Sequence, residues 1–277
     1  MIVNFFDNNI RHAGSYDEAL EPGRKNLNIV YEYFQTQKSN ITLFTDSYLS
    51  EAKNVDTDFK VAWIMEPRAL CPGIYEYLEK NIDLFDRILT FDHDLLVNYP
   101  QKCQWIPADG IFLDSDSIFN SVKKDRFCSH LYSAKTILEG HKFRHTLALE
   151  IKNKDLKVDM FGTGPNTYLA KKSESLNRYR FSFAIENNIK NTYFTEKILD
   201  CFATKTIPIY RGAPNIGDWF DIRGIFPFET IGEAVEIVEN ADTDLYEKMK
   251  PFVEENYKKS LQFYSVDQFI YEELRRL

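Results

Sequence analysis

Short apolar runs alternate with segments of helical spacing along most of the chain. Runs rich in β-branched and aromatic residues predict five strands, at residues 1–6, 41–45, 59–65, 87–91 and 103–107. The third run is apolar except at Lys60, which is typical of a strand covered on both faces. Segments of helical spacing lie between the strands, for example residues 73–85. This alternation predicts an α/β domain with a mostly parallel sheet.

A second alternation follows a polar segment without clear period, residues 109–125, which is predicted to link two domains. Further strands are expected at residues 126–132, 157–162, 181–187 and 206–212, with helices at 141–151 and 195–202. The C-terminal part predicts three more helices, at residues 232–240, 244–261 and 266–277. We therefore expect an N-terminal domain at 1–120 and a C-terminal domain at 121–277. Ligands of such sheets bind beyond the carboxyl ends of the strands.

Composition narrows the classes of function. The net charge of −8 argues against broad binding to nucleic acid or to anionic membranes. The sequence contains no apolar stretch of the ~20 residues that a transmembrane helix needs, and its start does not resemble a signal peptide. The four cysteines include no C-x-x-C pair, so we expect reduced thiols in a cytoplasmic protein and no zinc site.

The helix expected after Thr195 carries an unusual lysine. Its apolar residues fall on one face, but Lys197 lies in the first turn, where the helix dipole disfavours a cation. The preceding strand should bring Glu186 and Asn187 to its carboxyl end, beside the same helix start. Free N–H groups and a lysine there would suit a phosphate or diphosphate, and Glu196 could accept hydrogen bonds from ribose hydroxyls. The alternative from the residues alone is a solvated Glu–Lys pair on a surface helix.

The same stretch, ENNIKNTYFTEK at residues 186–197, resembles the signature of the α-1,3/1,4-fucosyltransferases, glycosyltransferase family ten. That signature reads roughly E-N-[ST]-x-x-x-x-Y-[VI]-T-E-K, and the chain matches it at Glu186, Asn187, Tyr193, Thr195, Glu196 and Lys197. The flanking elements KFRHTLALEI, VDMFGTG and TIPIYRGAPNI are also similar to the family pattern, and the resemblance covers roughly residues 127–273. The chain departs from the pattern at Asn188, Phe194 and Arg211.

The resemblance implies a GT-B fold, with two Rossmann-like α/β domains facing a cleft and helices at the C-terminus. It implies an inverting, metal-independent enzyme that transfers fucose from GDP-fucose to a hydroxyl of an acceptor glycan, without a further cofactor. Arg144 and Lys197 would neutralise the diphosphate and Glu196 would bind the ribose. Glu186, Asn187 and Tyr193 would complete the donor site.

The resemblance also implies a general base, Glu66. This residue follows the apolar strand at 59–65 and precedes Pro67, which favours an extended residue before it. A carboxylate there would take the proton of the acceptor hydroxyl. The alternative is a solvated loop glutamate, in which case Asp46 and Asp109 are the next candidates.

Two other patterns suggest metal sites only weakly. The chain contains D-x-D at residues 92–94 and 114–116, which we interpret as solvated helix starts or linker, with Asp92 as an N-cap. His141 and His145 have the spacing of one helix face, but the sequence offers no third ligand. No metal site is therefore predicted.

Two alternatives to fucosyl transfer remain open at this stage. The first is the same fold and chemistry with another nucleotide-sugar donor. The second is a nucleotide-sugar-binding protein without turnover.

Overall fold

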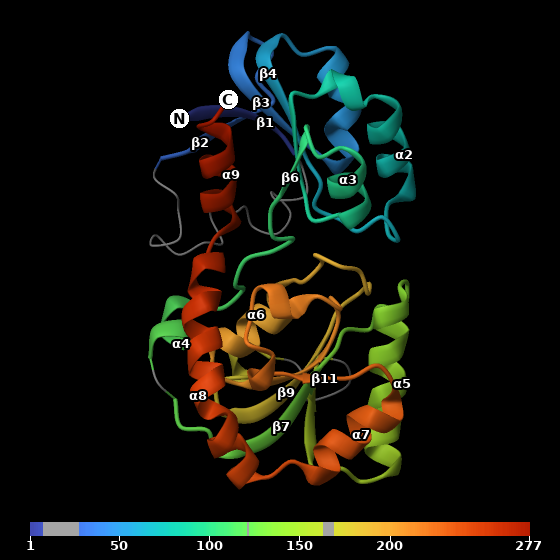
Figure 1. The fold of residues 1–277 in the computed structure, drawn as a ribbon, viewed down its shortest axis with the longest axis vertical. Helices are drawn as coiled ribbons and strands as arrows, with labels where there is room; N and C mark the ends of the chain where they lie inside the picture. The colour runs from blue at the N-terminus through green and yellow to red at the C-terminus, as the bar shows by residue number, and fades with distance from the viewer. Residues whose placement is uncertain (8–27, 121, 163–168) are drawn as a thin grey trace. The chain divides into compact units, whose positions relative to one another are not determined.

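The computed structural model describes residues 1–7, 28–120, 122–162 and 169–277, which divide into two compact units (Figure 1). Unit 1 combines Met1–Asp109 with Ser265–Leu277, and unit 2 is Gly110–Tyr264. The first boundary thus lies earlier than the predicted one at residue 120. The last residues, Ser265–Leu277, also belong to unit 1 and not to a continuous C-terminal domain.

Unit 1 contains a six-stranded sheet in the order β2-β1-β3-β4-β5-β6, in which every pairing is parallel. Its strands are β1 (Ile2–Phe6), β2 (Val30–Tyr33), β3 (Ser39–Thr45), β4 (Thr57–Trp63), β5 (Arg87–Thr90) and β6 (Cys103–Trp105). Its helices are α2 (Pro72–Lys80), α3 (His93–Asn98) and α9 (Val266–Leu274), and a 3-10 helix occupies Asp46–Lys53.

Alternating residues of β3 and β4 pack into two separate cores. Leu43 and Val61 belong to a cluster that includes Ile270 of α9, whereas Phe44 and Ala62 belong to a cluster formed with α2 and α3. Successive side chains of a strand point to opposite faces of the sheet, so a strand covered on both sides must be apolar throughout. Helix α9 therefore belongs to unit 1 because it covers one face of this sheet.

The sequence reading missed β2. Among the strands that the structure describes, it lies at the edge of the sheet and pairs with β1 alone. Its residues are alternately exposed and partly buried, so it lacks the continuous apolar run of the central strands.

Unit 2 contains a five-stranded parallel sheet in the order β11-β10-β9-β7-β8. Its strands are β7 (Arg126–Leu131), β8 (Val158–Phe161), β9 (Tyr179–Ile185), β10 (Ile207–Arg211) and β11 (Phe226–Pro227). Its helices are α4 (Ser115–Phe119), α5 (Glu139–Asn153), α6 (Glu196–Ala203), α7 (Ile231–Asn240) and α8 (Thr243–Ser260). Short α4 lies in the segment predicted to be a linker.

The core of unit 2 positions the ends of its central strands. Phe181, Phe183 and Ile185 of β9 pack with apolar residues of α5, α7 and α8, and Figure 1 shows α5 and α8 flanking the sheet. Because β7, β9 and β10 run parallel, their carboxyl ends meet at one edge, where α5 and α6 begin.

None of the helices in the described residues has the length and apolar character of a membrane-spanning segment.

The packing of α9 generates a stability prediction. Ile270 is fully buried in the core of unit 1, so Ile270→Ala should lower the free energy of unfolding by about 2–5 kcal/mol. Urea denaturation measures this quantity. Val97→Ala is the control because Val97 is 60% exposed on α3, and it should change the stability by about 0.5 kcal/mol or less. An equal effect of the two changes would mean that α9 contributes nothing to this core.

Candidate active site

The carboxyl end of β9 is tied to the start of α6 by a buried glutamate. Glu186 is fully buried, and its two carboxylate oxygens accept hydrogen bonds from Thr195, one from the backbone nitrogen at 2.9 Å and one from Oγ1 at 2.7 Å. Thr195 is itself the N-cap of α6. Burial raises the pKa of Glu186, although Lys197 opposes the shift. Hydrogen bonds therefore join the strand end and the helix start that the sequence predicted.

Lys197 lies in the first turn of α6 and contacts two carboxylates. Its Nζ lies 3.2 Å from Oε1 of Glu196 and 3.6 Å from Oε2 of Glu186, and it donates to Oγ1 of Thr195 at 3.0 Å. These carboxylates compensate for the unfavourable helix dipole. The Glu–Lys pair is thus real, but it is partly buried rather than solvated, because the side chains of Lys197 and Glu196 are only 22% and 15% exposed.

The charge pairing continues beyond Glu196. Lys172 places Nζ 3.4 Å from Oε1 of Glu196 and 2.7 Å from Oδ2 of the fully buried Asp200. Burial alone would raise the pKa of Glu196, but Lys197 and Lys172 outweigh it and hold that pKa well below its usual range. Glu186, Lys197, Glu196, Lys172 and Asp200 therefore alternate in sign, and we call these five residues the ion chain.

Arg144 of α5 reaches the same strand end. Its guanidinium donates to the carbonyl oxygen of Ile185 and, at 2.9 Å, to Oδ1 of Asn187. Helix α5 approaches so closely here that a Cβ at Gly140 would lie 1.9 Å from the carbonyl oxygen of Glu186. Only glycine fits at that position without a backbone shift. The loop after β9 is consequently held from two sides, by α5 and by α6.

These elements surround a cavity of about 430 Å³. Four of the six residues predicted for the donor site in this unit line it: Arg144, Asn187, Glu196 and Lys197. The other two, Glu186 and Tyr193, are buried and do not line it. Among the described lining residues the cations are Lys135, Arg144, Lys172 and Lys197, and the only carboxylate is Glu196. This excess of positive charge suits an anionic ligand.

The sequence reading did not single out Lys135 or Lys172. Lys172 belongs to a short 3-10 helix, Lys172–Ser175, and no spacing pattern marks it. Its partner Asp200 does carry a signal, because it is an acid among the buried residues of α6. A fully buried carboxylate requires a cation or several donors, so its position predicts an unidentified partner.

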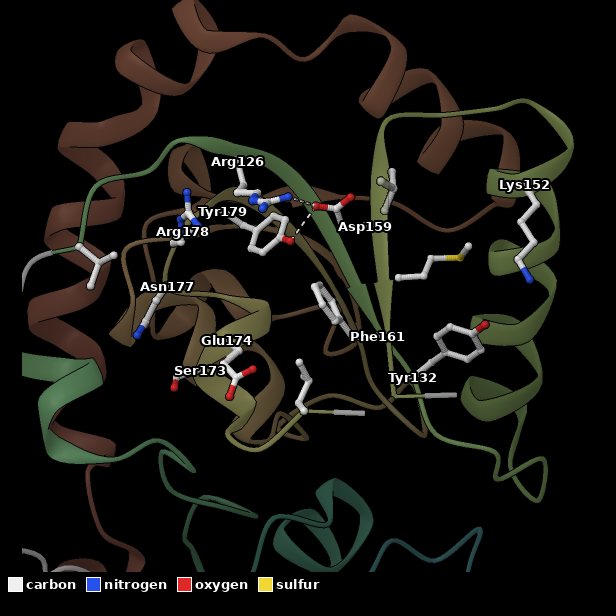
Figure 2. Close-up of a pocket in the computed structure, with 14 residues that line it drawn as sticks. Arg126, Tyr132, Lys152, Asp159, Phe161, Ser173, Glu174, Asn177, Arg178 and Tyr179 are labelled. Atoms are coloured by element: carbon white, nitrogen blue, oxygen red, sulfur yellow. Dashed lines mark hydrogen bonds and ion pairs between the residues drawn. The ribbon is translucent and has the colours of Figure 1, made fainter. Parts of the chain in front are cut away.

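Unit 2 contains a larger hollow, of about 920 Å³, beside the edge strand β8 (Figure 2). Figure 2 shows Asp159 at its rim, where the carboxylate lies 3.3 Å from Arg126 and accepts a hydrogen bond of 2.7 Å from Tyr179. Arg178 forms an ion pair with Asp125. These charged groups are paired with one another. The larger hollow is therefore a poorer candidate for an anion-binding site than the cavity beside α6, despite its size.

Unit 1 gathers carboxylates at the carboxyl ends of three adjacent strands. Asp7, Asp46 and Glu66 follow β1, β3 and β4. Asp46 is 4% exposed and its Oδ1 accepts a hydrogen bond of 3.0 Å from the backbone of Met65. The hydroxyl of Tyr75 donates to the carbonyl oxygen of Glu66 at 2.8 Å. These hydrogen bonds fix the backbone around half-buried Glu66.

Asp46 has a perturbed titration. Burial raises its pKa to about 7, and the neighbouring Glu66 adds to the shift, against the hydrogen bond from Met65. A carboxyl group with such a pKa can hold or release a proton near neutral pH. Asp46, the second-choice base in the sequence reading, thus shares an electrostatic environment with Glu66.

Both D-x-D patterns lie at helix starts, and the N-cap predicted at Asp92 is confirmed. Asp92 caps α3 by accepting from the backbone of Leu95 at 3.0 Å, and Asp114 caps α4 by accepting from Ser117 at 3.0 Å. His141 accepts a hydrogen bond from the backbone of Leu138 through Nδ1. Within the part of the chain that the structure describes, no three potential metal ligands cluster.

The fold belongs to the GT-B class of glycosyltransferases. A crystal structure of an α1,3-fucosyltransferase with GDP aligns over 98% of this chain and 88% of its own, with a TM-score of 0.62 and 16% identity. TarM aligns over 84% of this chain and 54% of its own, with a TM-score of 0.57 and 10% identity. At such identities the likeness concerns the fold.

A family model matches part of the chain. Residues 123–217, which lie within unit 2, match the model of the glycosyltransferase family 10 (fucosyltransferase) C-terminal domain. An α-(1,3)-fucosyltransferase of Helicobacter pylori is 28% identical over 127 residues, which cover 45% of this chain and 23% of that protein. A fucosyltransferase-like protein of Arabidopsis thaliana is 36% identical over 82 residues, or 29% of this chain and 16% of its own. The chain therefore aligns with less than a quarter of each of these two relatives.

The buried carboxyl of Asp46 generates a pH prediction. Its folded-state pKa of about 7 lies above the ordinary value near 4. The folded chain thus holds this proton more tightly than the unfolded chain, and its ionisation costs stability as the pH rises from about 4 to about 7. Asp46→Asn cannot ionise and tolerates the positive φ of 27°. The variant should gain stability relative to the native chain between pH 5 and pH 8, as measured by urea denaturation.

The control for this prediction is Asp94→Asn, which removes an exposed carboxylate from the same unit. A difference between Asp46→Asn and the native chain that stays constant with pH would contradict the raised pKa.

Proposed function

We propose that this protein transfers fucose from GDP-fucose to a hydroxyl of an acceptor glycan, with inversion and without a metal ion. The observation that carries the proposal is Lys197 at the start of α6, in a cavity whose described lining residues include four cations and one carboxylate. The match of residues 123–217 to the fucosyltransferase model supports fucose as the sugar. The absence of disulfides among the four cysteines supports a reducing, cytoplasmic setting.

Lys197 and Arg144 would bind the diphosphate of the donor. In the structure, Lys197 is paired with Glu186 and Glu196, so a diphosphate would enter as a further anionic partner at the positive end of the helix dipole. As the bond from the sugar to the β-phosphate breaks, negative charge grows on the leaving group. Cations already held in position stabilise that charge without reorganisation.

The remaining donor-site residues would act in different ways. Glu196 lines the cavity and is held ionised, so it can accept hydrogen bonds from the ribose hydroxyls. Asn187 lines the cavity beside Arg144. Glu186 and Tyr193 are buried behind the wall, so we assign them a positioning role, Glu186 by fixing Thr195 and Lys197.

Glu66 of unit 1 would serve as the general base. The acceptor hydroxyl attacks the anomeric carbon and its proton passes to the Glu66 carboxylate, while the diphosphate leaves with the electron pair of the broken bond. The backbone hydrogen bonds at Met65 and Glu66 support this role because they fix the loop that carries the base.

The phosphate-binding role predicts a ligand effect. GDP should raise the melting temperature of the native chain in the presence of EDTA, because a ligand that binds only the folded state stabilises it. Lys197→Ala removes a charged hydrogen-bond donor and should weaken GDP binding by roughly 10–100-fold. Calorimetry measures the affinity. Lys190→Ala is the matched control, since Lys190 is exposed in the same loop and does not line the cavity.

Three outcomes would count against this assignment. Stronger protection by UDP or CMP than by GDP would point to another donor, and a requirement for Mn²⁺ would contradict metal independence. Unchanged GDP affinity in Lys197→Ala would mean that the lysine serves only the internal ion pairs.

The base role predicts a separate kinetic effect. Glu66→Gln keeps the size of the side chain but cannot accept the proton, so the transfer rate should fall by ~10²–10⁴-fold while GDP affinity stays nearly constant. The measurement is product formation against pH, with calorimetry of GDP alongside. Glu76→Gln, which removes an exposed carboxylate of α2, is the control. Transfer within threefold of the native rate would direct attention to Asp46 and Asp109.

A further inference from the structure

Lys172 occupies a different position in the cavity wall from Lys197. Its Nζ lies 2.7 Å from Asp200 and 3.4 Å from Glu196, so its nearest partner is the buried carboxylate behind the wall. The corresponding distances from Nζ of Lys197 to the carboxylates of Glu196 and Glu186 are 3.2 Å and 3.6 Å. Lys172 is therefore the more firmly anchored of the two cations.

Asp200 gives that anchor its rigidity. It is fully buried, it lies one turn after Glu196 on α6, and its Oδ1 accepts a hydrogen bond of 2.8 Å from the backbone of Phe112. Residues four apart on a helix lie on the same face. One oxygen of Asp200 thus accepts from the backbone at Phe112 while the other forms an ion pair with Lys172, so Lys172 is tied to α6 through a carboxylate that is itself held in place.

Glu196 is contacted by both lysines in the structure. Its Oε1 lies 3.2 Å from Lys197 and 3.4 Å from Lys172. Under the proposed function Lys197 binds the diphosphate, so its hold on Glu196 weakens at the moment when Glu196 must accept the ribose hydroxyls. Lys172, tied to Asp200, is then the cation that keeps the carboxylate ionised and in place.

We propose that Lys172, anchored by Asp200, is a positioning residue that orients the Glu196 carboxylate toward the ribose and so sets the preference for ribonucleotides over deoxyribonucleotides. This inference rests on the proposed function, because it takes Glu196 as the ribose acceptor. It adds a role for two residues, Lys172 and Asp200, that lie outside the sequence signature. The ligand class it concerns is a ribonucleoside diphosphate.

The test compares GDP with 2′-deoxy-GDP and 3′-deoxy-GDP in calorimetry. The native chain should bind GDP roughly tenfold or more tightly than at least one deoxy analogue, because loss of a hydroxyl removes a hydrogen bond to a charged acceptor. Lys172→Met keeps the length of the side chain without its charge. It should weaken GDP binding and leave the affinity for that analogue within about twofold of the native value. The ratio of the two affinities then falls toward one.

A direct contact of Lys172 with phosphate makes the opposite prediction. In that case Lys172→Met would lower the affinities for GDP and for its deoxy analogues by the same factor. The preference for GDP would persist, which would overturn the inference. A double-mutant cycle sharpens the comparison. In a Glu196→Gln background, the change Lys172→Met should have no further effect on the preference, and an additional loss there would also contradict the inference.

The buried Asp200 requires a folding control, because removing Lys172 leaves its charge uncompensated. The double variant Lys172→Met/Asp200→Asn removes both charges and should show the same loss of preference at a melting temperature nearer the native one. Asp200→Asn alone loosens the anchor and should reduce the preference in part. Retention of the full preference in the folded double variant would refute a positioning role for Lys172.

The outcome separates this inference from the proposed function. If UDP proves to be the better ligand, the same comparison with UDP and its deoxy analogues tests Lys172 independently of the base. If the native chain binds GDP but shows no preference over either analogue, the ribose contact of Glu196 is wrong and the role of Lys172 falls with it. A native preference that Lys172→Met leaves intact refutes the inference alone.

Discussion

The ion chain is the constraint on which the rest of unit 2 depends. Three carboxylates and two ammonium groups alternate from Glu186 to Asp200, with successive N···O distances of 3.6, 3.2, 3.4 and 2.7 Å. Moving such charges out of water is costly, and it is compensated only when each has opposite charges and hydrogen bonds around it. The ion chain therefore fixes three segments relative to one another: the end of β9, the first turns of α6 and the 3-10 helix that carries Lys172. A structural requirement of the fold thus organises the groups that face the cavity.

This arrangement also explains why a cation is tolerated in the first turn of α6. Lys197 is stabilised by internal carboxylates, so the fold does not need a ligand to keep it there. Under the proposed function, a diphosphate would be added to the carboxylates that already hold the lysine, so its binding would require little reorganisation. Fixed cations of this kind act mainly on charge that develops during the reaction. Structural stability and electrostatic preorganisation are therefore two consequences of the same contacts.

The sequence predicted the parts of the structure that leave a local pattern. The apolar run of β4 and the T-E-K start of α6 are examples, since burial on two faces and capping geometry each impose residue types. Edge strand β2 escaped notice because it is half exposed. The pattern of α9 predicted a helix but not its place in unit 1, which depends on contacts with residues more than 200 positions away, such as the hydrogen bond from Tyr31 to Asp267. Lys172 was missed because its partners Glu196 and Asp200 are brought to it only by folding.

The two units place opposite charges at the carboxyl ends of their sheets, and the proposed chemistry gives a reason for this. The cavity of unit 2 is rich in cations, whereas unit 1 gathers Asp7, Asp46 and Glu66. A carboxylate placed among the lysines of unit 2 becomes a weak base, as the lowered pKa of Glu196 illustrates. A carboxylate among other acids and away from water is more basic, as the pKa of about 7 for Asp46 illustrates. General-base catalysis is most effective when the pKa is near the working pH. An enzyme that must both stabilise a leaving diphosphate and deprotonate a hydroxyl therefore gains by assigning the two tasks to separate sheets.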